Sequence, residues 1–187
     1  VPFYYFFLLF CPVSGIKEAS SLKGDFMKLI TNLVFLAYLL PFAAQAAQAD
    51  WSEPGETYSG NKHIEVYYSK TCGCCKNWMR HLKDHQFTVN PIAEEDMQGI
   101  KERYGVEGQY ASCHTAIIDG YVIEGHVPAD DIKRLLKQKP NIKGLSVPAM
   151  PVGTPGMEQG DRKDPFYVIT LPETGEKPKI FRAYENY

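Results

Sequence analysis

The segment at residues 63–69 leads directly into a turn with three cysteines, followed by a segment with helical periodicity. The β-branched and aromatic residues of HIEVYYS are typical of a strand, and the apolar residues between 75 and 82 recur at the spacing of one helix face. Residues 87–93 read as a second strand. Residues 94–104 read as a second helix, with acidic residues in its first turn and a glycine just past its end. This pattern predicts a β, α, β, α order.

A hairpin and a last helix follow this unit. Asp119-Gly120 separates two short apolar segments and is the strongest short-range signal for a two-residue β-hairpin. Pro128 then opens a helix with one apolar face, and Pro140 closes it. A βαβα unit followed by a hairpin and a helix is the chain order of the thioredoxin fold. We therefore expect an α/β protein with a thioredoxin-like core (βαβα-ββα) and the cysteine turn at the position of its active site.

Two segments lie beyond this core. Residues 144–160 contain four glycines and three prolines, and structureless loops of this length are commonly functional or disordered. Residues 166–171 and 179–183 read as two strands around a polar turn. We expect a long Gly/Pro/Met loop and then an extra C-terminal β-hairpin.

The N-terminal residues predict export. We expect the true start at Met27, because Lys28, the apolar residues 33–42 and the small residues that follow form a signal-peptide pattern. The expected organisation is an upstream extension plus signal peptide (1–49), a flexible linker (50–62) and one domain (63–187). The alternative is an uncleaved anchor, since residues 29–47 approach the roughly 20 apolar residues of a membrane span, but Pro41 and two glutamines disfavour it. We expect a periplasmic protein whose mature form does not span the membrane.

The charge and cysteine content narrow the function classes. With 20 Lys and Arg against 22 Asp and Glu, the formal net charge is −2, and no basic excess points to nucleic acid. One of the five cysteines falls in the leader. Export would place the other four in an oxidising compartment, where disulfides are the default for an even count.

The cysteine turn supports two kinds of chemistry. Cys72 and Cys75 alone form the C-x-x-C of a disulfide exchanger, and they are the redox candidates. Cys74 adds a third sulfur in the same turn. A helix start lowers the pKa of a thiol, and three crowded thiolates repel each other unless a cation lies among them. Soft sulfur ligands select Cu(I) or zinc. A redox disulfide and a metal site both remain open at this point.

Cys113 and His114 precede the first hairpin strand. In a thioredoxin fold this loop faces the cysteine turn, so it would bring a fourth sulfur and an imidazole to the same place. The alternative is that Cys113 is a small buried hydrophobe. Disulfide exchangers usually have a cis proline here, and this sequence has none.

Other candidate ligands carry weaker signals. His126 lies just before the last helix, where a histidine is more often a capping or packing residue. Met150 and Met157 lie in the long loop, and a thioether suits Cu(I) and suits zinc poorly. His81 and His85 are four residues apart on the first helix, and we expect them on its solvated polar face.

Four motifs together resemble the CopG-like periplasmic copper-resistance proteins, and the likeness covers residues 64–184. They are Cys72-Gly73-Cys74-Cys75, Ser112-Cys113-His114-Thr115, Gly125-His126-Val127-Pro128 and residues 144–157 (GLSVPAMPVGTPGM). The resemblance implies a thioredoxin-like fold and a role in copper tolerance. It also implies copper held by the four cysteines with help from Met150, Met157 and His126, with a multinuclear cluster as one option.

The expected function is therefore periplasmic Cu(I) binding for copper resistance, with thiol-coupled copper redox as an option. Metal ions, and other periplasmic copper-handling proteins, are the expected partners. Metal binding is favoured over catalysis. The alternatives are a thiol-disulfide oxidoreductase, in which Cys72 attacks and Cys75 resolves, and a structural zinc site.

Overall fold

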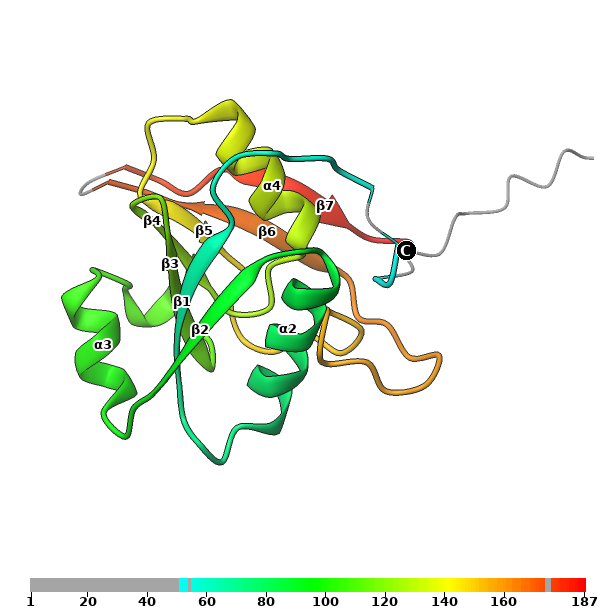
Figure 1. Cartoon of the computed structure of the whole chain (residues 1–187), viewed down its shortest axis with the longest axis horizontal. Coiled ribbons are helices and arrows are strands. Elements are labelled where there is room, and N and C mark those ends of the chain that lie inside the picture. The colour runs from blue at the N-terminus through cyan, green and yellow to red at the C-terminus, as the bar shows by residue number, and fades with distance from the viewer. Residues whose placement is uncertain (1–50, 54, 174–175) are drawn as a thin grey trace, which may run out of the picture. The chain divides into compact units, whose positions relative to one another are not determined.

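A seven-stranded sheet runs through the part of the chain that the computed structural model describes, residues 51–53, 55–173 and 176–187 (Figure 1). In chain order the elements are β1 (His63–Tyr68), α2 (Gly73–Asp84), β2 (Thr88–Ala93), α3 (Met97–Arg103), a 3-10 turn (Gly108–Tyr110), β3 (His114–Ile118), β4 (Tyr121–Glu124), α4 (Ala129–Gln138), β5 (Gly144–Ser146), β6 (Phe166–Leu171) and β7 (Ile180–Tyr184). The protein is mixed α/β, and the predicted order of strands and helices is confirmed as far as α4. The predicted leader, residues 1–49, lies outside the described residues.

The strand order in the sheet is β2-β1-β3-β4-β5-β6-β7. β1 and β2 pair in parallel and are joined by α2, whereas β3 is antiparallel to β1. β3 and β4 form the predicted hairpin. Its turn residues, Asp119 and Gly120, have φ angles of 47° and 83°, because a two-residue hairpin turn needs left-handed backbone that asparagine, aspartate and glycine tolerate.

The prediction of a loop from residue 144 onward was wrong for its first residues. Gly144, Leu145 and Ser146 form β5, which pairs in parallel with β4. A Cβ at Gly144 would overlap the carbonyl oxygen of Val122, so glycine permits this close pairing. Three residues are too few for the period-2 pattern of a strand to be recognised. β6 and β7 pair antiparallel and extend the sheet beyond β5, as the predicted C-terminal hairpin requires.

Helices cover both faces of the sheet: α2 and α4 lie on one face and α3 on the other (Figure 1). The alternation of side chains along β3 and β4 explains this. Ile118 and Ile123 join the larger apolar cluster with residues of α2 and α4. Val122 belongs to the smaller cluster beside α3, and the partly buried Ile117 packs against that cluster. Within the described residues, no helix has the length and apolar character needed to cross a membrane.

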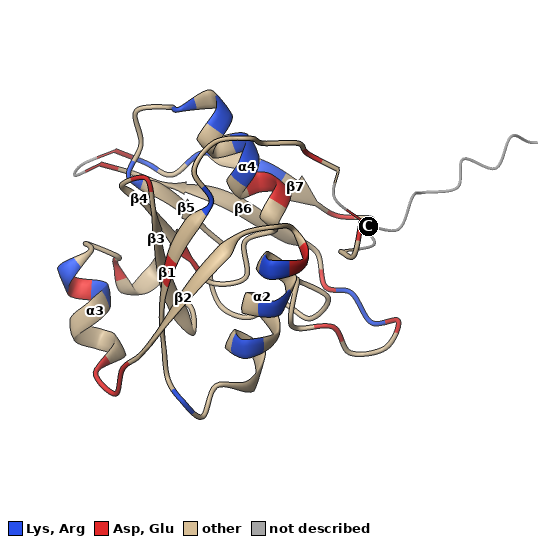
Figure 2. Ribbon diagram, viewed as in Figure 1, with Lys and Arg blue, Asp and Glu red and all other residues tan. Residues whose placement is uncertain are grey.

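The segment before β1 packs on the domain through Trp51. Its indole Nε1 donates to the carbonyl oxygen of Gly153 at 2.7 Å. Its ring lies 5.5 Å from that of Tyr184 and 6.3 Å from those of His81 and Phe166, measured between centroids. Farther along, Glu56 pairs with Lys137 of α4. Figure 2 shows both signs of charge interspersed on α3 and α4.

Strand register gathers three segments at one end of the sheet. Tyr68, the last residue of β1, lies opposite His114, the first residue of β3. Thr115 in turn lies opposite Glu124, the last residue of β4. The residues just after β1, just before β3 and just after β4 therefore meet, and they include the four cysteines and His126.

Candidate metal centre

The cysteine turn forms the start of α2. Cys72 is the N-cap residue, and its sulfur accepts the backbone N–H of Cys75 at 3.2 Å. Cys72 and Cys75 are joined by a disulfide, so two of the three thiolates expected here are bonded to each other. Cys75 is buried, whereas Cys74 is a partly exposed free thiol.

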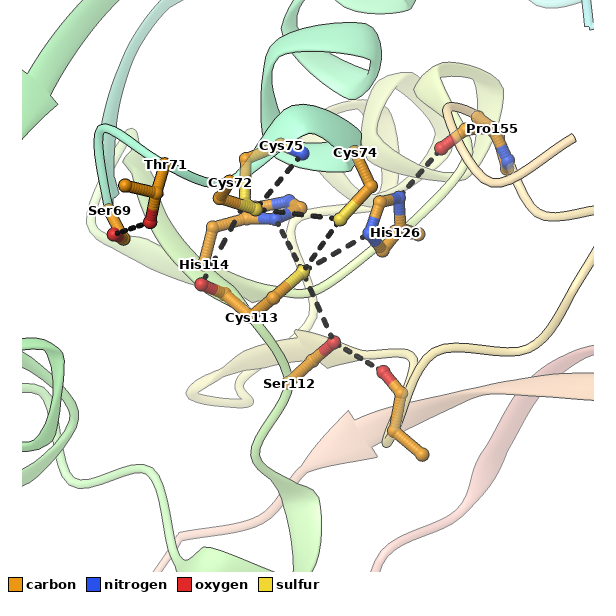
Figure 3. The surroundings of a disulfide bond; sticks show 11 residues. Ser69, Thr71, Cys72, Cys74, Cys75, Ser112, Cys113, His114, His126 and Pro155 are labelled. Atoms are coloured by element: carbon orange, nitrogen blue, oxygen red, sulfur yellow. Dashed lines mark hydrogen bonds between the residues drawn. A yellow bond between two sulfur atoms is a disulfide. The ribbon is translucent and has the colours of Figure 1, made fainter.

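Cys113 points toward this turn (Figure 3). Its sulfur lies 3.8 Å from that of Cys74, which is itself 3.4 Å from the sulfur of Cys72. The four sulfur atoms all lie within 4.8 Å of one another. Two segments about forty residues apart in the chain thus supply a single sulfur cluster.

His126 approaches the same sulfur through its ring nitrogen Nε2. Its Nδ1 lies 2.8 Å from the carbonyl oxygen of Pro155. Because a carbonyl can only accept, Nδ1 carries the hydrogen and Nε2 presents a lone pair. Nε2 lies 3.2 Å from the sulfur of Cys113. Burial lowers the pKa of His126, which keeps the imidazole neutral.

His114 adds a second imidazole. Its Nδ1 lies 3.3 Å from the sulfur of Cys113, and its ring packs on Trp78 with centroids 4.3 Å apart. Its Nε2 is buried and has no hydrogen-bond partner among the residues that the structure describes. Burial first, and then the charges of His126 and Lys101, lower the pKa of His114 well below its ordinary value. Cys113, His114 and His126 form a second group of side chains close enough to share a metal ion.

These donors fit a soft metal ion. Thiol sulfur and neutral imidazole nitrogen suit Cu(I) and zinc and suit hard cations poorly. Burial, and then the neighbouring Cys74, raise the pKa of Cys113 to about 12. In the metal-free protein Cys113 is therefore a thiol, and a bound cation would replace its proton. Buried polar atoms rarely lack a hydrogen bond. Nε2 of His114, which has none among the described residues, is therefore a further candidate metal ligand.

The long Gly/Pro/Met loop lies over the start of α2. Gly156 has φ +84°, and a Cβ there would lie 2.5 Å from the backbone nitrogen of Trp78. Pro155, just before it, supplies the carbonyl that orients His126. Met157 follows and is partly buried, whereas the side chain of Met150 is 51% exposed. The loop thus reaches the centre through its backbone, and the two methionines stay predicted ligands.

The prediction for His81 and His85 was wrong, because both side chains are buried. His81 Nε2 accepts the backbone N–H of Ala129 at 3.0 Å, and His85 Nε2 donates to the carbonyl oxygen of Trp51 at 2.7 Å. The segment around Trp51 and the start of α4 cover this side of α2. Sequence reasoning missed this because the covering segment was expected to be a linker.

Sequence reasoning also missed a buried ion pair behind Cys113. Lys101 Nζ lies 2.6 Å from Glu124 Oε1, and the carboxylate is fully buried. The sequence held one signal for it. Glu124 is a charged residue at the end of an otherwise apolar strand (YVIE), and Lys101 in a short helix carries the opposite charge. A strand end is commonly exposed, so this signal was weak.

The fold and the cluster define a mixed α/β protein with a cysteine and histidine centre suited to a soft metal ion. A family model described as "Protein of unknown function, DUF411" matches residues 110–157. Two solved structures of copper resistance protein CopG are similar. Form 1 is 42% identical, with a TM-score of 0.64 and coverage of 68% of this chain and 100% of its own. Form 2 is 43% identical, with a TM-score of 0.63 and coverage of 67% and 99%.

None of the curated proteins matches the chain. The identity and the full coverage of the solved relatives establish the relationship. The chain belongs to the CopG-like copper-resistance family, as the sequence motifs predicted.

Proposed function

We propose that this protein binds Cu(I) through Cys72, Cys74, Cys75 and Cys113 and thereby contributes to copper resistance. The observation that carries the proposal is the convergence of four sulfurs within 4.8 Å of one another. The names of the solved relatives, both copper resistance proteins, support the choice of copper. Zinc shares the preference for sulfur and is the weaker candidate.

In this proposal, three further residues help the cysteines to bind Cu(I): His126, Met150 and Met157. The lone pair of His126 Nε2 is directed at the cluster, which supports its role as a nitrogen ligand. The support for the methionines is their position in a loop that packs against α2. Several soft donors around one shared sulfur would allow more than one copper ion to bind.

We infer a thioredoxin-like core from β1 to α4, with its cysteine turn at the start of α2. The support is the order β2-β1-β3-β4, the helices on both faces and a C-x-x-C disulfide at a helix N-terminus. The signal-peptide pattern supports the periplasm as the location, with other copper-handling proteins there as partners.

A copper-linked redox reaction is consistent with the disulfide. Oxidation of the Cys72 and Cys75 thiols forms one sulfur–sulfur bond and releases two protons and two electrons. Two Cu(II) ions accept these electrons and become two Cu(I). Reduction of the disulfide by an external dithiol would return both sulfurs to the metal site.

The test is Cu(I) binding without oxygen, measured by competition with a Cu(I) chelator. We expect the reduced protein to bind tightly and the disulfide form to bind fewer ions, because two of the sulfurs are then unavailable. Cys113→Ser should weaken binding, whereas Ser69→Ala, which removes a hydroxyl paired with Thr71 outside the cluster, should not. Tight zinc binding with indifferent copper binding would contradict the proposal.

The methionines are tested by Met150→Leu/Met157→Leu. Because leucine keeps the apolar volume and removes the sulfur, we expect weaker Cu(I) binding and unchanged zinc binding. Unchanged Cu(I) affinity would remove both residues from the ligand set.

A thiol-disulfide oxidoreductase is the second candidate, and the Cys72–Cys75 disulfide is the observation that favours it. It predicts reduction of insulin disulfides by the metal-free protein and loss of this activity in Cys72→Ser. If the metal-free protein does not reduce insulin disulfides but does bind Cu(I), the oxidoreductase function is excluded and copper binding remains as the proposed function.

A further inference from the structure

The buried carboxylate of Glu124 is hydrogen-bonded to the chain on both sides of Cys113 and His114. Glu124 Oε1 accepts the backbone N–H of Ser112 at 2.6 Å, and its Oε2 accepts the hydroxyl of Thr115 at 2.6 Å. The two residues between these contacts are the ones whose side chains reach the cluster. Glu124 thus has one hydrogen bond immediately before this pair and one immediately after it.

Lys101 supplies the charge that makes this carboxylate stable inside the protein. Its Nζ lies 2.6 Å from Glu124 Oε1 and 3.1 Å from Thr115 Oγ1. The exposed fractions are 0% for Glu124 and 7% for Lys101. A buried ion pair is often no more stabilising than an apolar pair of the same volume, so stability alone does not explain these charges.

The far side of Ser112 is held as well. Its hydroxyl donates to the carbonyl oxygen of Ala149, and the Ala149 N–H donates to the carbonyl oxygen of Ala111. The chain before Cys113 is therefore fixed between β4 on one side and the long loop on the other. Because Cys113 follows Ser112 directly, we expect a displacement of Ser112 to displace the sulfur of Cys113 as well.

We propose that Glu124, with Lys101 as its counter-charge, is a positioning residue that holds Cys113 and His114 against the cysteine turn and so sets the metal affinity of the cluster. This inference rests on the proposed Cu(I) binding and adds a part of the site that does not touch the metal. Outer contacts that orient metal ligands commonly change metal affinity by about 10- to 100-fold.

The experiment compares two charge-free double variants. Lys101→Met/Glu124→Gln keeps a carbonyl oxygen that can accept the Ser112 N–H, whereas Lys101→Met/Glu124→Leu has none. We expect the Gln variant to bind Cu(I) within about threefold of the wild type and the Leu variant to bind about 10-fold more weakly or worse. Lys137→Met/Glu56→Gln removes an exposed ion pair distant from the cluster and should leave binding unchanged.

A second measurement needs no metal. In the reduced, metal-free proteins, the rate of Cys113 alkylation by iodoacetamide is followed by peptide mass mapping. We expect faster alkylation in the Leu variant than in the Gln variant, because Cys113 is no longer held against Cys74 and His126. This measurement separates the two proposals: a wild type without Cu(I) affinity defeats the proposed function, and the alkylation rates still test the positioning.

A purely structural role predicts a different result. The Leu variant would then unfold at a lower temperature but, while folded, show the wild-type Cu(I) affinity and alkylation rate, and this outcome would overturn the inference. If the Leu variant does not fold, Glu124→Asp replaces it. Aspartate keeps the charge and withdraws the oxygens from Ser112, so we expect a loss of Cu(I) affinity of at least about threefold, and no loss would equally overturn the inference.

Discussion

Gly156 shows how one residue couples the long loop to the start of α2. Its φ of +84° lies in the left-handed region, and its Cα faces the backbone of Trp78 and Cys74. Only glycine satisfies both the conformation and the contact. The residue before Gly156, Pro155, has its carbonyl oxygen 2.8 Å from Nδ1 of His126.

We expect Gly156→Ala to lower the free energy of unfolding by about 1–3 kcal/mol, because a strained backbone conformation is combined with a clash. Chemical denaturation of the metal-free protein measures the change. Gly160→Ala is the matched control, since Gly160 also has a positive φ (+57°) but open space around a Cβ. Gly160→Ala should lower the free energy of unfolding by about 1 kcal/mol, because it has only the cost of a left-handed backbone conformation and no clash. Equal losses in the two variants would show that the loop does not press on the helix.

At the scale of elements, local patterns predicted most of the fold. The turn at Asp119 and Gly120 and the apolar faces of α2 and α4 leave periodic or turn-specific signals. β5 left none, because its three residues are held by pairing with β4 rather than by their own propensity. The four-cysteine cluster was predictable because the fold order brings both segments together. The buried Lys101–Glu124 pair was not, since single charged residues carry no mark of burial.

The segment before β1 is an element whose role follows from tertiary contacts alone. The indole of Trp51 contacts the rings of His81, Phe166, Tyr184 and Tyr187. Because this indole is partly buried, we expect Trp51→Ala to destabilise the protein by about 2 kcal/mol, below the range for fully buried tryptophans. Chemical denaturation of this variant is compared with that of the exposed Glu53→Ala. Identical unfolding curves would show that the segment contributes nothing to the folded domain.

At the scale of the whole molecule, buried histidines make stability depend on pH. Burial, and then the neighbouring His85, lower the pKa of His81 from 6.5 to about 3. Between these two values the unfolded chain binds a proton at His81 that the folded protein does not. The contribution of neutral His81 is therefore fully present above about pH 6.5 and is lost as the pH falls toward 3.

We expect the free energy of unfolding of the metal-free protein to fall between pH 6.5 and pH 5, with His81 contributing up to about 1.4 kcal/mol per pH unit. Urea denaturation at both pH values measures the slope. His81→Gln, which keeps an acceptor for the Ala129 N–H and does not titrate, should reduce that slope. A slope unchanged by this substitution would assign the pH dependence to other groups.

The carbonyl oxygen of Pro155 determines which ring nitrogen of His126 has a free lone pair. With its hydrogen committed to that carbonyl, the ring can accept an electrophile at its other nitrogen without first surrendering a proton. If a metal ion bound here, the protons released to the buffer would come from the cysteine thiols and not from His126. The backbone of one proline thus selects the tautomer of a histidine that comes from a different segment of the chain.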